Sequence, residues 1–261
     1  MLRYNMVDCH MHSSFSADSH TDMAEHCKAA IELGLAGICF TEHVDFDPVD
    51  FCYGFFNYDA YRRGIEAARA RFGDRLAIGM GAEISFSSDA ADDISRFLDS
   101  HEFDFVIGSV HLVDHVFVGR APFFDGRSEE QVYAPYWAEM EAMAASGLFR
   151  HIGHFDYPKQ ARPSQWGPLS IERWREPIGA ALRAVLDAGA LLEVNTSGIR
   201  KGTGEPFPSW DILNLYSQLG GTAVTMGSDA HRSCDVGAFF DPVRDRLNAM
   251  GLAVVGIDLP A

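Results

Sequence analysis

The sequence predicts an α/β fold in which a parallel sheet closes into a TIM-like barrel. Seven apolar, strand-like runs alternate with helical segments along the chain. Parallel strands need long crossover connections, which such helices supply. The 261 residues suffice for one barrel, and no linker rich in Pro, Gly or Ser divides them. We therefore expect a single domain over residues 1–261.

The expected strands are short apolar runs that end at polar residues. The first run leads into His10, and the second ends in Thr41-Glu42-His43. A further apolar run, residues 252–257, follows the last helix. The seven strand-like runs are residues 4–9, 35–40, 76–82, 103–110, 150–153, 191–194 and 222–226.

The expected helices show helical spacing of apolar residues and recognisable end signals. Gly34 suits a helix C-terminus because glycine adopts the left-handed backbone conformation without strain. Ser128 and Gln131 have the spacing of a capping box, which opens another helix. Pro177 lies inside the fifth helix and would kink it. The expected helices cover residues 23–33, 59–71, 90–98, 128–145, 170–188, 208–219 and 236–250.

Composition argues against several classes of function. A formal net charge of -16 disfavours binding to nucleic acid or to an anionic membrane surface. No apolar run approaches the roughly 18 residues of a membrane span, and residues 1–4 lead into a strand without a signal-peptide core. The five cysteines form no C-x-x-C pair, which suits reduced thiols. We expect a cytoplasmic protein, and the sequence leaves its oligomeric state open.

Residues that bind metals gather at the predicted strand ends. His10 and His12 lie two apart, so on a strand both imidazoles face the same way and can bind one cation. In a parallel barrel the carboxyl ends of the strands share one face, where the chemistry gathers. Six of the seven strands deliver a histidine or carboxylate there, and Asp18 follows in the first loop. The candidate ligands are His10, His12, Asp18, His43, Glu83, His111, His154, Asp229 and His231.

The candidate ligands indicate a particular kind of metal chemistry. Imidazole and carboxylate without thiolate suit zinc, iron or manganese and disfavour a structural zinc finger. The set is too large for one tetrahedral ion and sufficient for two or three. Clustered ions promote phosphoryl transfer because they generate a hydroxide, position it and hold the attacking and leaving oxygens. The sequence thus predicts hydrolysis of a small anionic phosphate ester.

The same stretches resemble the PHP (polymerase and histidinol phosphatase) metallophosphoesterases. Many members of that family carry Asp-Gly after the H-x-H and Thr-Asp-His at the second strand. This chain has Ser-Ala-Asp-Ser and Thr-Glu-His, which looks more like the histidinol-phosphate phosphatase branch. The motifs that occur in the family's order are DCHMHSSFSADS, ICFTEHVDF, GAEISF, FDFVIGSVH, HIGHFD, EVNTSGIRKG and GSDAH.

The resemblance implies a distorted (β/α)7 barrel with three metal ions, zinc, iron or manganese. It implies hydrolysis of L-histidinol phosphate to L-histidinol and phosphate by a hydroxide shared between metals. Glu83 would bridge two ions. A water on the third metal, His231 or Asp229 would protonate the leaving alkoxide, and the sequence does not choose among them. The implied shells are His10, His12, Glu83 and Asp229 for one ion, Glu83, His111 and His154 for the second, and Asp18, His43 and His231 for the third.

Phosphate also needs cationic side chains, and guanidinium matches its oxygens best. Arg162 and Arg200 follow the fifth and sixth strands, so we expect both to bind the substrate phosphate. Lys159 and Lys201 are as readily explained as solvated loop residues. The aromatic segment 51–56 and Trp166 are either part of the substrate wall or part of the core.

Three other functions remain open from the sequence. A related phosphoesterase could act on a nucleotide or another small phosphate monoester with the same metals. An amidohydrolase-like barrel also uses an H-x-H motif with later His and Asp ligands, although the glutamate of the third strand counts against it. A protein that binds metal and phosphate without catalysis is the third.

Overall fold

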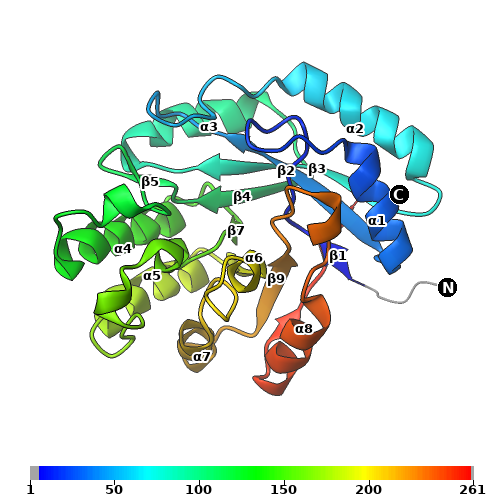
Figure 1. Cartoon of the computed structure of the whole chain (residues 1–261). Helices are drawn as coiled ribbons and strands as arrows, with labels where there is room; N and C mark the ends of the chain where they lie inside the picture. Colours follow the sequence, from blue (N-terminus) through cyan, green and yellow to red (C-terminus); the bar gives the residue numbers. More distant parts are fainter. Residues whose placement is uncertain (1–5, 260–261) are drawn as a thin grey trace.

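The computed structural model describes residues 6–259, in which parallel strands curl into a barrel with helices outside them (Figure 1). The order in the sheet is β1-β2-β3-β4-β7-β8-β9-β10, and every pairing in it is parallel. Residues 4 and 5 of the first expected strand lie outside the described range. The strands are β1 Val7–Asp8, β2 Gly37–Val44, β3 Ala77–Ser85, β4 Phe105–Ser109, β7 His151–Ile152, β8 Leu191–Asn195, β9 Ala223–Gly227 and β10 Ala253–Val254.

The helices cover the outer face of the barrel, as the sequence predicts (Figure 1). Gly34 ends the first of them with a φ of 77°, and Ser128 and Gln131 form the expected capping box. The helices are α1 Met23–Leu33, α2 Tyr58–Phe72, α3 Ala91–Ser100, α4 Glu129–Ala145, α5 Arg175–Asp187, α6 Ser197–Arg200, α7 Trp210–Gln218 and α8 Phe240–Ala249. No helix among residues 6–259 combines the length and the apolar character needed to cross a membrane.

Two local expectations are wrong, and one hairpin was not predicted. Helix α5 begins at Arg175, so Pro177 lies in its first turn, where a missing N–H breaks no helical hydrogen bond and causes no kink. The stretch after β8, expected as a loop, contains the short helix α6. The stretch after β4 contains an antiparallel hairpin of β5, Leu112–Val113, and β6, Val116–Phe117.

The barrel closes where the first and last ligand motifs meet. The His12 N–H donates to the Ala230 carbonyl at 2.9 Å, and the Asp229 N–H donates to the His10 carbonyl at 2.8 Å. Strand β10 pairs with the start of β9, through Ala253 opposite Ala223, and leaves the end of β9 free for this contact. We call this β1–β9 contact the seam. It places residues from the two ends of the chain side by side.

The core between barrel and helices also fixes the active face. Helix α4 buries Tyr136 and Trp137 completely, and the Trp137 ring lies 5.6 Å from that of Phe155. The Tyr136 hydroxyl donates to the Phe155 carbonyl at 2.9 Å. Phe155 directly follows His154, so the packing of α4 sets the position of that imidazole.

A half-buried histidine in β7, His151, should make the free energy of unfolding depend on pH. Burial lowers the pKa of His151 to about 4 from its ordinary 6.5, and its ring packs 4.2 Å from that of Phe105. The folded state therefore binds fewer protons than the unfolded state between those values, and this stability is lost as pH falls from 6.5 toward 4. For metal-free protein, we expect His151→Gln to remove about 2 kcal/mol of the fall in unfolding free energy between about pH 7 and 5, measured by urea titration. The exposed His20 is the control, and His20→Gln should keep the wild-type pH profile.

Candidate metal centre

Glu83 lies at the centre of the candidate ligands. It comes from β3, is 1 % exposed, and turns its two oxygens toward different neighbours. Oε1 lies 2.7 Å from His154 Nε2 and 3.3 Å from His111 Nε2. Oε2 lies 3.3 Å from His10 Nε2 and 3.4 Å from His12 Nε2. One carboxylate thus faces two separate sets of imidazoles.

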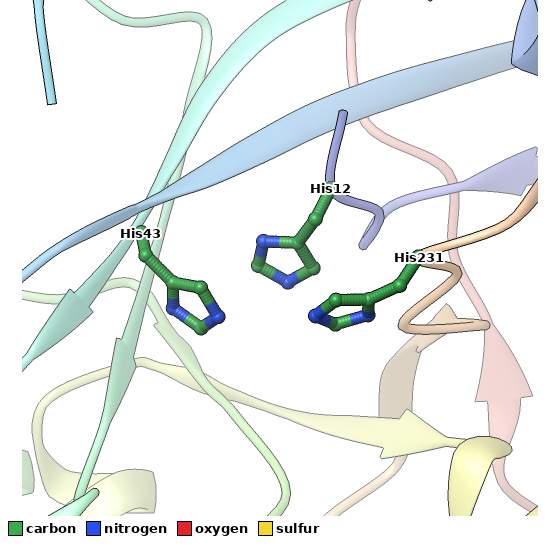
Figure 2. Close-up of side chains that lie close together, drawn as sticks. All are labelled: His12, His43 and His231. Carbon is green, nitrogen blue, oxygen red and sulfur yellow. The ribbon is translucent and has the colours of Figure 1, made fainter. Parts of the chain in front are cut away.

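Three histidines from three strand ends form a second group (Figure 2). His12 follows β1, His43 is in β2 and His231 follows β9. The His12 ring lies 4.2 Å from that of His43 and 4.4 Å from that of His231. Asp18 joins them, since its Oδ2 lies 2.9 Å from His231 Nε2 and 3.4 Å from His43 Nε2. The first loop therefore returns to the group that His12 begins.

Asp229 is held in an unusual backbone conformation by its neighbours. Its φ is 52°, in the left-handed region, which costs free energy for a residue with a side chain. Ser197 Oγ and Lys201 Nζ contact its Oδ2 at 2.9 and 3.1 Å. Arg200 donates to its carbonyl at 3.0 Å. These contacts leave Oδ1 directed at the histidines, 3.5 Å from His12 Nε2.

The pKa shifts in the cluster follow from burial and close charges. Burial raises the pKa of Glu83, but His10, His111 and His43 outweigh it and hold that pKa well below its usual range. Burial, together with His43 and His231, holds the pKa of His12 well below its usual value. The Glu83 carboxylate is thus charged and the His12 imidazole neutral, the forms that bind metal. Nearby carboxylates outweigh burial and raise the pKa values of His10, His43 and His111, so these imidazoles would have to release protons on binding a metal ion.

The donor atoms fit metal ions better than they fit one another. His10 Nε2 and His12 Nε2 face each other at 3.0 Å, an arrangement that needs a shared proton or a cation. His43 and His154 each keep a buried Nδ1 without a hydrogen-bond partner among the described residues. Groups of three donors lie within 4.8 Å of one another in several combinations, such as His10, His12 and Glu83. The imidazoles and carboxylates suit zinc, iron or manganese.

A cavity of about 400 Å³ opens over this cluster. Arg200, Lys201 and Arg232 line it, together with Tyr157 and Phe51. It therefore has room for a small substrate, with three cationic side chains at its wall.

Arg162, expected at the substrate phosphate, does not line this cavity. Its guanidinium forms an ion pair with Glu129, and its Nε donates to the Gly167 carbonyl at 2.7 Å. Trp166 packs against Arg162 and Phe124 and is likewise absent from the cavity lining. Lys201, for which the sequence leaves a solvated role and a phosphate-binding role equally open, lies beside Asp229.

Comparison with known proteins places the chain in a family. Residues 8–197 match the PHP domain. The chain belongs to the PHP family. The histidinol-phosphatase of Lactococcus lactis is 33% identical over 86% of this chain and 84% of its own. A probable histidinol-phosphatase of Deinococcus radiodurans is 31% identical over 95% of each chain.

Solved structures agree with this PHP assignment. The crystal structure of the Lactococcus lactis histidinol phosphate phosphatase, complexed with zinc, L-histidinol and phosphate, covers 97% of this chain and 99% of its own. Its TM-score is 0.87 at 29% identity. A putative histidinol phosphatase from Listeria monocytogenes has a TM-score of 0.79 at 22% identity and covers 90% of this chain and 99% of its own. The expected barrel fold is thereby confirmed.

One residue of this PHP site escapes the sequence reasoning. Glu193 is fully buried in β8; its Oε1 lies 2.6 Å from His10 Nδ1 and its Oε2 accepts the His154 N–H at 2.9 Å. A carboxylate that contacts the far nitrogen of an imidazole fixes which nitrogen is free for metal. The sequence signal that could have identified this residue is a glutamate within the apolar run of the strand LLEVN.

Replacement of Glu193 should weaken metal binding without emptying the site. In Glu193→Gln the amide still contacts His10, but the charge that orients and polarises the imidazole is lost. We expect zinc affinity to fall by about 10- to 100-fold, as for other residues behind metal ligands. Competition with a chromophoric chelator measures it. Unchanged affinity would mean that the contact with His10 is structural only.

Proposed function

We propose that this protein hydrolyses L-histidinol phosphate to L-histidinol and phosphate with three bound metal ions. The observation that carries the proposal is Glu83, whose two oxygens face separate sets of imidazoles beneath a substrate-sized cavity. The relatives named histidinol-phosphatase, one of them crystallised with zinc, L-histidinol and phosphate, support the choice of substrate.

The proposed metal shells follow the donor geometry. His10, His12, Glu83 and Asp229 would hold one ion, and Glu83 would share a second with His111 and His154. Asp18, His43 and His231 would hold the third. Ions bound there would acidify water and neutralise negative charge on the transferring phosphoryl group.

The protein's own residues would orient the substrate. Arg200 lines the cavity and also holds the Ser228 carbonyl at 2.7 Å, so its guanidinium is fixed in place for a phosphate oxygen. Lys201 adds a second charge beside it. Of the two side chains that are candidate proton donors, Asp229 already has Oδ2 occupied by Ser197 and Lys201. The other, His231, would itself bind the third ion through Nε2, and its Nδ1 lies 3.1 Å from the Asp229 carbonyl oxygen, so water in the cavity would supply the proton to the leaving oxygen.

A substrate panel tests the proposal. Zinc-loaded protein should show its highest kcat/KM with L-histidinol phosphate, compared with a nucleoside monophosphate, a simple sugar phosphate and a cyclic amide. A higher kcat/KM with the nucleotide or the amide would contradict the proposed substrate. Tight phosphate binding without turnover of any of them would indicate a protein that binds without catalysis.

The proposed division of ligands predicts which ion each variant loses. Asp18 contacts His43 and His231, whereas His10 faces Glu83 and His12. We expect Asp18→Ala and His10→Ala each to lose one equivalent of metal, measured by elemental analysis, and the double variant to lose two. Loss of the same single equivalent in all three would show that the division is wrong.

A further inference from the structure

Two buried aspartates, Asp45 and Asp50, line the cavity next to the metal centre, and Asp45 also faces the far nitrogen of the candidate ligand His111. Asp45 and Asp50 lie in the segment that follows β2 and are 8 % and 6 % exposed. A carboxylate oxygen of each lies within 4.8 Å of the other and of a His111 nitrogen. Two buried carboxylates this close repel each other unless a cation lies near them.

Most of their oxygens have no hydrogen-bond partner within residues 6–259. Asp50 Oδ1 accepts the Cys52 N–H at 2.8 Å, but Oδ2 is buried and without a hydrogen bond. Both oxygens of Asp45 are buried and lack a hydrogen bond, and the near group is His111 Nδ1 at 3.6 Å. Buried carboxylates without a partner destabilise the fold, and a bound cationic group would remove this penalty. The pair is therefore a site prepared for a cationic group of a ligand.

The opposite side of the cavity carries three cationic side chains, which outnumber the two carboxylates that they contact, Asp229 and Asp235. Arg200 and Lys201 follow β8, and Arg232 follows β9. The sheet order places β8 and β9 on the other side of β1 from β2, and His12, which follows β1, lies between them. The cavity thus has a basic side that suits a phosphate and an acidic side that suits an ammonium.

We propose that Asp50, assisted by Asp45, binds the ammonium group of an amino-alcohol phosphate and so selects this substrate class. The inference rests on the proposed function and extends it, since L-histidinol phosphate carries an ammonium group near its phosphate ester. Phe51 and Phe117 line the same part of the cavity, with ring centroids 6.5 Å apart, and offer an apolar wall to an imidazole ring. Nucleoside and simple sugar phosphates carry no ammonium group and would leave the two carboxylates unpaired.

A pair of substrates that differ only in the amino group tests the inference. These are L-histidinol phosphate and its analogue with hydrogen in place of the amino group. The zinc-loaded wild type should prefer the amine by at least about 10-fold in kcat/KM, the effect of one hydrogen bond between charged groups. Asp50→Asn should lower kcat/KM for the amine by about 10- to 100-fold and remove most of this preference. The asparagine Oδ1 can still accept the Cys52 N–H, so the turn should persist.

Asp47→Asn is the matched control, because Asp47 lies in the same segment but pairs with the exposed His115 at 2.6 Å and does not line the cavity. It should keep the wild-type preference. Equal losses on both substrates, or loss of a metal equivalent in Asp50→Asn, would overturn the inference. Asp50→Ser, whose hydroxyl can also accept the Cys52 N–H, replaces that variant if it fails to fold.

The wild type alone separates the two proposals. Equal kcat/KM values for the two substrates would overturn amine recognition and leave the proposed function standing. Turnover of another phosphate monoester but of neither member of the pair would overturn both.

Discussion

Glu83→Gln should abolish hydrolysis and release metal at the same time. A neutral amide removes the negative charge that both Oε1 and Oε2 offer to the surrounding imidazoles, so both groups of donors lose their shared ligand. We expect kcat to fall by at least about 1000-fold, or about 4 kcal/mol of transition-state stabilisation. We also expect loss of at least one equivalent of metal by elemental analysis.

The control for this variant is Glu66→Gln, which changes an exposed glutamate on α2 whose partner is Arg62 at 4.0 Å. It should keep full activity and metal content. A Glu83→Gln protein that kept its metal and lost only activity would assign Glu83 a role in catalysis rather than in metal binding. Full activity in that variant would contradict the proposed centre altogether.

Removal of metal should be as damaging as loss of Glu83, and reversible. After dialysis against a strong chelator we expect less than about 1 % of the zinc-loaded activity with L-histidinol phosphate, because the residues that remain cannot activate water. We also expect the unfolding free energy to fall by about 4 kcal/mol or more when the ions are removed from near-saturating conditions.

Adding single metals back to the metal-free protein shows which of them support turnover. Zinc, iron(II) or manganese should restore turnover, whereas magnesium should not, because it prefers oxygen ligands and this site is rich in imidazole. Full phosphatase activity in protein shown to be free of metal would contradict the proposed mechanism.

The parallel alternation of strands and helices and the strand-end ligands could be predicted from sequence. An apolar run that ends in a histidine marks both a strand and the face to which it delivers the side chain. His43 illustrates this, since β2 extends beyond its apolar core and carries the imidazole into the cluster. The hairpin of β5 and β6 has no comparable signal, because each strand has two residues and its position depends on packing.

The roles of residues that depend on a contact with a residue far away in the sequence were harder to predict. Arg162 and Arg200 have similar positions after a strand motif, yet Glu129, far away in sequence, pairs with Arg162 and keeps it out of the cavity. Glu193 lies inside a strand rather than at its end, so a search of strand ends passes over it. Asp45 and Asp50 suggest an ammonium site only because their carboxylates lie close together, and their spacing in the sequence does not predict that distance.

The seam determines when the proposed metal site can form during synthesis of the chain. Met11 pairs with Ala230 across almost the entire chain, and ligands lie on both sides of that bridge. On the ribosome, His10 and His12 emerge long before Asp229 and His231 exist, so a complete set of donors forms only after nearly all of the barrel has been synthesised. Closure of so long a loop is also among the most entropically costly contacts in the fold. Completion of the proposed metal site would therefore come late in synthesis, and bound ions would hold residues 10–12 to residues 229–231.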